Sequence, residues 1–178
     1  ERMLNSPSIA LSLATKEIIR MATFCRDNLE YSMKAFFGKD LKLVKKVYEY
    51  EEIIDSLEKS LAFYLAKVAQ HSMVPELSDK HSGLLNAVND LERVGDHSEN
   101  IANLAQKRIE ENLPFSESAE EELRVMHEYV LDTFEKAIYA LEHEDRETAQ
   151  EIKERERKID YMEKQLRTCL LYTSPSPR

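Results

Sequence analysis

Tryptophan is absent from this sequence, and glycine, proline and cysteine are scarce, with three, five and two residues among 178. So few turn-forming residues favour long uninterrupted helices. Cys25 and Cys169 cannot build a disulfide framework, and no paired Cys/His spacing supports a zinc site. No apolar run approaches the roughly 18 residues that span a bilayer, and no signal-peptide pattern is present. We therefore expect a helical chain that is itself soluble and stays in a reducing compartment.

Positive charge is also in short supply. The chain has 25 Lys and Arg against 34 Asp and Glu, which gives a formal net charge of -9. Binding to nucleic acid needs clustered basic residues, so a nucleic-acid partner is excluded and bound cations fit better. The hydrophobic content of 42% can supply a core, and no alternating β-type segment is present.

Five helices are predicted from the few turn and capping signals that the chain contains. Asp40 and Asp145 are predicted N-caps, and Ser118 with Glu121 forms a predicted capping box. Short loops between long helices make antiparallel neighbours, so the expected fold is an all-α bundle. The predicted helices cover residues 7–37, 40–74, 78–112, 118–143 and 145–167.

The pattern Glu-x-x-x-Asp-x-x-Glu occurs three times, well above chance for this composition. On a helix these three positions fall within about 60° of one another, so each motif directs three carboxylates the same way. Like charges at this spacing destabilise a helix, so cations or basic side chains are expected nearby. The motifs are Glu51, Asp55 and Glu58; Glu92, Asp96 and Glu99; and Glu156, Asp160 and Glu163.

The first two motifs lie along the edge of an apolar stripe rather than opposite it. In the second predicted helix, Glu51 and Glu58 flank a stripe that includes Ile54 and Leu61. In the third, Gly95 falls inside the stripe, where a glycine costs about 1 kcal/mol relative to alanine. Close helix packing is therefore expected at Gly95, with the carboxylates near the boundary between surface and interior.

The chain also contains a repeat with an offset of 105 residues. Asp40, Asp55 and Leu61 become Asp145, Asp160 and Leu166 when 105 is added to each number. The fourth and fifth predicted helices therefore repeat the first and second. A counterpart of the third helix, with a fourth acidic motif, would lie beyond residue 168.

The last ten residues, CLLYTSPSPR, break the acidic helical character of everything before them. This string resembles translated adapter sequence from a transposase-based sequencing library. We therefore treat residues 169–178 as an artefact and exclude them from the prediction of the fold.

Two segments carry a family resemblance. The segment 91–97, LERVGDH, followed by Asn-Ile-Ala at 100–102, is similar to the signature of PhoU domains, and the segment 51–58, EEIIDSLE, resembles their other acidic motif. The resemblance implies an elongated antiparallel bundle of two tandem three-helix repeats. The first repeat would cover residues 6–113, and the second, at 114–168, would lack its last helix.

The resemblance also implies a metal site, because PhoU domains bind multinuclear metal clusters through Glu/Asp-x-x-x-Asp motifs. A set of carboxylates favours Mg²⁺, Mn²⁺ or Fe over sulfur-bound Zn²⁺, although Zn²⁺ stays open. Salt bridges to Arg93, Lys59, Arg157 and Lys164 are the alternative use of the carboxylates. The implied ligands are Glu51, Asp55, Glu92, Asp96, Glu156 and Asp160, with Glu58, Glu99 and Glu163 as additional ones.

The N-terminal segment 4–11, LNSPSIAL, resembles the junction between the membrane domain and the C-terminal PhoU-like domain of bacterial sodium-phosphate cotransporters. Residues 1–5 would then end a linker from a covalently attached membrane transporter domain upstream. The expected role is non-enzymatic regulation of phosphate transport at the cytoplasmic face of the cell membrane. Homo-oligomerisation stays open.

Two other functions are alternatives. A free-standing PhoU-type adaptor would act on a separate phosphate transporter and its histidine kinase, and it would have no membrane spans before Glu1. A carboxylate-bridged di-iron oxidase would need Glu-x-x-His pairs on facing helices, and the sequence contains none.

Overall fold

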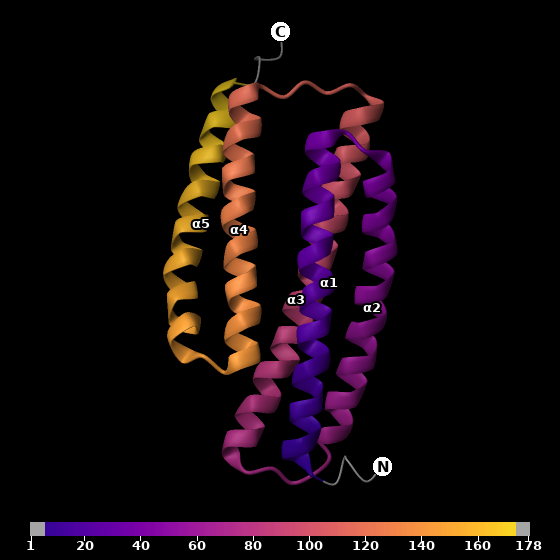
Figure 1. The fold of residues 1–178 in the computed structure, drawn as a ribbon, viewed down its shortest axis with the longest axis vertical. Helices are drawn as coiled ribbons and strands as arrows, with labels where there is room; N and C mark the ends of the chain where they lie inside the picture. The colour runs from indigo at the N-terminus through magenta and orange to yellow at the C-terminus, as the bar shows by residue number, and fades with distance from the viewer. Residues whose placement is uncertain (1–5, 174–178) are drawn as a thin grey trace. The chain divides into compact units, whose positions relative to one another are not determined.

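The structure, a computed structural model, describes residues 6–173. Within that range it contains five α-helices and no strand, which confirms the predicted all-α class (Figure 1). None of the described helices is long and apolar enough to cross a membrane. The helices are α1 (Pro7–Gly38), α2 (Leu41–Val68), α3 (Pro75–Glu110), α4 (Glu117–His143) and α5 (Arg146–Thr173).

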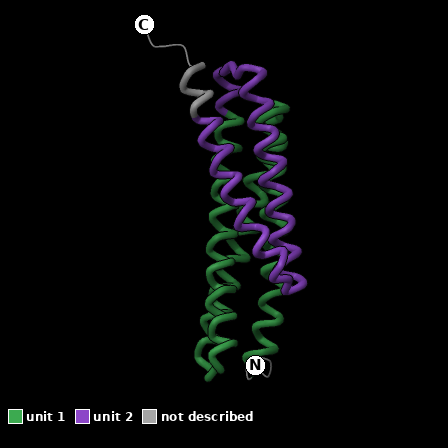
Figure 2. Tube along the Cα trace, turned by 90° about the vertical axis from the view of Figure 1, so that its left-hand side faces the viewer, with its two compact units in different colours: residues 1–106 green, residues 107–178 purple. Residues whose placement is uncertain are grey.

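The chain divides into two compact units, Glu1–Gln106 and Lys107–Arg178 (Figure 2). Unit 1 contains α1, α2 and most of α3. Unit 2 contains the last turn of α3 together with α4 and α5. The boundary lies inside α3, a little before the limit at 113 that the sequence predicted for the first repeat.

In unit 1, α1 packs on α2, and α3 is joined to both. The Cys25 thiol donates to the carbonyl of Leu91 at 3.3 Å, and the Tyr48 hydroxyl donates to Asn103 Oδ1 at 2.7 Å. Fully buried apolar side chains from all three helices form one core, so this unit has the interior that the apolar stripes predicted. The largest of them are Leu11, Ile18, Met21, Val47, Ile54, Leu65, Val68 and Val88.

In unit 2, α4 packs on α5 as a helical hairpin. The Arg155 guanidinium lies 4.3 Å from the centre of the Tyr129 ring, and its Nε donates to Thr133 Oγ1 at 2.8 Å. Among the described hydrophobic residues of this unit, only Ala119 and Ala140 are buried. The hairpin is therefore held by polar and aromatic contacts more than by an apolar core.

The predicted helix limits were wrong at several places. Helix α2 ends at Val68 rather than just before Pro75, and α3 begins at Pro75 rather than Ser78, because proline suits the first helical position. Ser116, not Ser118, caps α4, since its hydroxyl accepts from the Ala119 N–H at 3.2 Å. The Ser118–Glu121 capping box therefore falls two residues too late.

Helix α5 begins directly after the predicted N-cap Asp145, but it continues to Thr173 rather than ending near Arg167. Its last turns enter the segment that resembles adapter sequence. No proline or glycine occurs between Arg167 and Thr173, so no residue in that stretch stops the helix. The rest of that segment, 174–178, lies outside the described residues.

The 105-residue offset is visible at the turns between α1 and α2 and between α4 and α5. Lys39 and Glu144 both have a φ of 52°, and their N–H groups donate to Ala35 and Ala140. Asp145 then accepts hydrogen bonds from two N–H groups of the first turn of the following helix, as Asp40 does. The two turns therefore have the same backbone conformation and the same capping hydrogen bonds at positions 105 residues apart.

Replacing Asp40 by Ala is expected to lower the free energy of unfolding of unit 1 by about 1 kcal/mol. The carboxylate accepts from the N–H groups of Lys42 and Leu43 at 2.8 and 3.4 Å, and alanine cannot. Urea denaturation followed by amide exchange in α2 measures the loss. Lys42→Ala, in the same turn, should leave stability nearly unchanged; an equal loss in both variants would contradict the capping role.

Candidate functional site

The first two acidic motifs face each other across α2 and α3 in unit 1. Glu51 extends from α2 onto the backbone of Gly95 on α3, where a Cβ atom would stand 2.6 Å from Glu51 Oε2 and 3.1 Å from Ile54 Cγ2. Only glycine leaves room for this approach, which confirms the close packing expected at this position. The Glu51 carboxylate thus lies at the line of contact between the two helices.

The electrostatics show that the six carboxylates of the two motifs act on one another. Burial, followed by the charges of Asp96, Asp55, Glu99 and Glu92, raises the pKa of Glu51 from 4.5 to about 7. Burial, followed by Asp96, Glu58 and Asp55, also raises the pKa of Glu92. Unit 1 therefore concentrates negative charge at one place, and a cation there would relieve the repulsion.

Basic side chains balance part of this charge. Lys59 pairs with Asp55 at 2.8 Å, as the alternative interpretation anticipated. Arg93 contacts Asp90 at 3.8 Å and Arg157 contacts Glu154 at 2.7 Å, and neither of these acids belongs to a motif. Lys59 thus pairs with a motif carboxylate, and the charge of Arg93 opposes the rise in the pKa of the motif residue Glu92.

The third motif lies on α5, which belongs to unit 2. Glu156 and Asp160 are exposed on α5, and the half-buried Glu163 accepts from Arg167 Nε at 2.9 Å. Unit 1 thus brings together the predicted residues Glu51, Asp55, Glu58, Glu92, Asp96 and Glu99, while the other three predicted residues belong to unit 2.

The donor chemistry of the unit 1 cluster fits a hard cation, because all its candidate ligands are carboxylate oxygens. Within the described residues, however, no group of three His, Cys, Asp or Glu side chains is placed so that it could hold a metal ion. The charge and the donor atoms therefore suit a cation, and side-chain rotation would be needed to coordinate one.

Two buried polar residues of unit 1 were not predicted as site residues from the sequence. Cys25 is buried, and burial together with the Glu51 charge raises the pKa of its thiol to about 12. Asn28 is 0% exposed, and neither polar atom of its amide has a hydrogen-bond partner. The sequence signal that could have identified Asn28 is its position one turn after Cys25, as a polar residue on the apolar face of α1.

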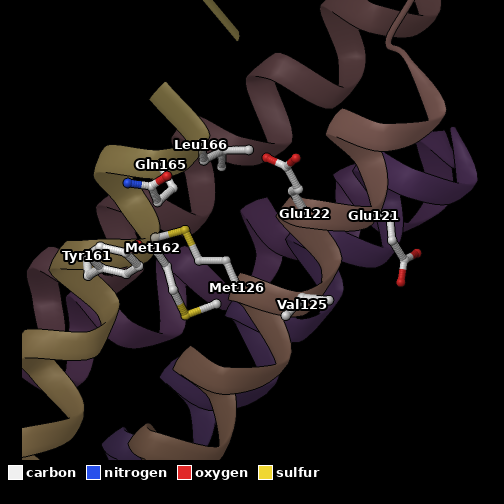
Figure 3. Close-up of a pocket in the computed structure, with 8 residues that line it drawn as sticks. All are labelled: Glu121, Glu122, Val125, Met126, Tyr161, Met162, Gln165 and Leu166. Atoms are coloured by element: carbon white, nitrogen blue, oxygen red, sulfur yellow. The ribbon is translucent and has the colours of Figure 1, made fainter. Parts of the chain in front are cut away.

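A groove in unit 2 runs between α4 and α5 and has a volume of about 470 Å³. Met126 and Met162 extend toward each other from the two helices, and Val125 and Leu166 add to its apolar lining (Figure 3). By the 105-residue offset Met126 and Leu166 match Met21 and Leu61, which are buried in unit 1. The repeated face is thus covered in unit 1 and open in unit 2.

Comparison with known families gives a match to the PhoU domain over residues 18–105 and 123–177, which is well over half of the chain. The chain belongs to the PhoU domain family. The first matched PhoU segment contains both acidic motifs of unit 1, and the second contains the motif of α5.

Several curated proteins resemble this PhoU chain. Over 153 residues, 84% of this chain, it is 26% identical to a phosphate-specific transport system accessory protein PhoU homolog of Xylella fastidiosa strain 9a5c. The homolog of Aquifex aeolicus is 26% identical over 92% of the chain. YjbB of Salmonella typhimurium, which is named as an inorganic phosphate export protein, is 22% identical over 76% of this chain.

These alignments cover different shares of the relatives. The aligned region is 62% of the Xylella protein and 74% of the Aquifex protein, but only 25% of YjbB. The aligned region thus makes up a large part of the accessory proteins and a minor part of YjbB.

Proposed function

We propose that this chain is the cytoplasmic PhoU-like regulatory domain of a sodium-dependent phosphate cotransporter. The role is non-enzymatic: the domain changes the activity of an attached membrane transporter according to phosphate status or cation occupancy. Its family membership and the phosphate-related names of its relatives support the link to phosphate transport.

The observation that carries the proposal is that the two acidic motifs of unit 1 face each other on α2 and α3. Glu51 reaches across to Gly95, and the charges of Asp96 and Glu92 act directly on it. A domain that concentrates carboxylates between two helices would respond to cations, because a bound cation removes the repulsion between the helices. Such a response is what a regulatory domain needs in order to pass a signal on.

The cations would be held by the six carboxylates of unit 1, with Mg²⁺, Mn²⁺ or Fe favoured by their oxygen donors. A bound metal would supply positive charge that draws α2 and α3 together. The third motif, Glu156, Asp160 and Glu163, would bind a cation more weakly, since two of its members are exposed and the third pairs with Arg167.

Attachment to a transporter is supported by YjbB, in which the matched region is a quarter of the whole protein. The alternative, a free-standing adaptor, is supported by the relatives named accessory proteins. The complete reading frame separates the two, because only the first has several membrane spans upstream of Glu1.

In the parent protein, deletion of residues 6–167 should change how phosphate uptake depends on external phosphate. Unchanged phosphate uptake would contradict a regulatory role.

The double variant Asp55→Asn, Asp96→Asn is expected to lose most of the metal that the unaltered chain retains after purification, with a drop of about tenfold or more. Each substitution removes one carboxylate from the cluster and with it part of the attraction for a divalent cation. Elemental analysis after exchange into metal-free buffer measures the content.

The matched control for this experiment is Asp79→Asn, Asp90→Asn, which removes two exposed carboxylates of α3 outside the motifs. Its metal content should equal that of the unaltered chain. Negligible metal in all three proteins would exclude the cluster as a metal site, and equal loss in both variants would show that only net charge matters.

A further inference from the structure

The core of unit 1 contains polar atoms that the described side chains leave unsatisfied. Asn28 Nδ2, Asn28 Oδ1 and Glu51 Oε2 are all buried and have no hydrogen-bond partner. In folded proteins nearly all buried polar atoms are bonded, either to protein or to ordered water, because an unsatisfied one costs about 1–3 kcal/mol. Three such atoms in one core call for a common explanation.

Contacts on either side of Asn28 place it at the level of Glu51. The rings of Phe24 and Tyr31, about one turn before and one turn after Asn28 on α1, both pack against Tyr50, with centres 5.5 and 5.3 Å apart. Tyr50 is the neighbour of Glu51 on α2. Asn28 and Glu51 therefore lie in the same layer of the bundle.

The contacts with α3 lead to the same layer. Helices α1 and α3 run in the same direction (Figure 1), and Cys25 is bonded to the carbonyl of Leu91. One turn further along each helix lie Asn28 on α1 and Gly95 on α3, and Gly95 is the residue that Glu51 Oε2 approaches. The Glu51 charge also acts on Cys25. Contacts from all three helices thus place Asn28 in the layer of the Glu51 carboxylate.

We propose that Asn28 and Glu51 together bind one internal water molecule in the core of unit 1, and that this water holds the Glu51 carboxylate against Gly95. A buried water makes about three hydrogen bonds. It donates to Glu51 Oε2 and to Asn28 Oδ1, and it accepts from Asn28 Nδ2 or a neighbouring donor. Asn28 is then a positioning residue, which acts on the acidic cluster through Glu51.

Unit 2 provides an internal comparison. By the 105-residue offset Asn28 corresponds to Thr133, which is also buried but accepts a hydrogen bond from Arg155. Glu51 corresponds to Glu156, which is exposed. Where the polar core residue has a protein partner, the matching glutamate lies outside the core. This inference rests on the proposed function only in treating Glu51 as a candidate cation ligand.

A double-mutant cycle of Asn28→Leu and Glu51→Leu tests the proposal, with unfolding measured in EDTA so that metal binding has no part. If the two side chains share a water, Asn28→Leu should raise the unfolding equilibrium constant about tenfold in the unaltered chain and have no such effect in the chain that already carries Glu51→Leu. The control pair uses Asn100→Leu, at an exposed position on α3, and should show no coupling. Independent effects of Asn28→Leu and Glu51→Leu would overturn the proposal.

Nuclear magnetic resonance of the unmodified, ¹⁵N-labelled chain gives a second test that needs no variant to fold. The side-chain amide protons of Asn28 should show a cross-relaxation peak with a long-lived water. Those of Asn89, which is exposed, should show only rapid exchange with solvent. Absence of the Asn28 peak would overturn the proposal, while the metal measurements above would be unaffected.

Discussion

Replacing Gly95 by Leu is expected to lower the free energy of unfolding of unit 1 by about 2 kcal/mol, although leucine favours helix far more than glycine. A Cβ atom at this position meets Glu51 Oε2 at 2.6 Å and Ile54 Cγ2 at 3.1 Å. Glu51 can swing away, but Ile54 is fully buried and can adjust only slightly. The rest of a leucine side chain must therefore push α2 and α3 apart. Amide hydrogen exchange in α2 and α3 measures the loss within unit 1 alone.

Gly83 provides the matched control, because it lies on the same helix with nothing within 4 Å of the position of a Cβ. Gly83→Leu should stabilise α3 by somewhat less than about 1 kcal/mol, through helix propensity alone. The same substitution at the two glycines should then differ by about 3 kcal/mol. Similar effects at both positions would show that α2 and α3 are not in close contact at Gly95.

Gly95→Ala separates the role of Glu51 from that of the packing. The methyl group needs only a displacement of the flexible carboxylate and a small adjustment of Ile54. Unit 1 should therefore tolerate alanine, with Glu51 turned toward solvent. In this variant the pKa of the Glu51 side chain should lie closer to the usual 4.5 than to the value of about 7 in the unaltered chain.

The helices and their repeat could be predicted because the signals that set them are local. Asp40 and Asp145 bond to N–H groups two and three residues away, so the sequence around them contains the whole interaction. Gly95 was predictable for a similar reason, since a glycine inside an apolar helical stripe has few uses other than close packing. The exact helix ends were less predictable, because the capping-box pattern favours Ser118 in sequence while Ser116 is the residue that caps α4.

The environment of the acidic motifs could not be predicted from their spacing. Three motifs with the same pattern have different surroundings: Glu51 is covered by α3, while Glu156 on α5 is exposed. Burial depends on which helix lies opposite, and that is a property of the whole fold. Asn28 was missed for the same reason, because its complete burial depends on helices that pack against α1 from elsewhere in the sequence.

A carboxyl group whose pKa rises on folding makes the folded state less stable at high pH than at low pH. Below pH 4.5 Glu51 is protonated in both the folded and the unfolded chain, so it costs no stability there. Between pH 4.5 and about 7 only the unfolded chain loses the proton readily, and stability falls until the folded group ionises. In EDTA, unit 1 should therefore become less stable as the pH rises from 4.5 to about 7.

Replacing Glu51 by Gln is expected to remove this decline and to stabilise unit 1 at about pH 8 in EDTA. The full shift of the pKa of Glu51 would correspond to about 3 kcal/mol, and screening by solvent at the exposed side of the residue reduces the expectation to roughly 1–2 kcal/mol. At about pH 4 the variant should match the unaltered chain. The measurement is the free energy of unfolding by urea across this pH range, followed by amide exchange in α2.

The matched control is Glu52→Gln, at the exposed neighbour on the same helix, which should leave the decline in stability in place. If Glu52→Gln removed it equally, the effect would belong to the net charge of the chain; if only Glu51→Gln does, it belongs to the carboxylate that α3 covers.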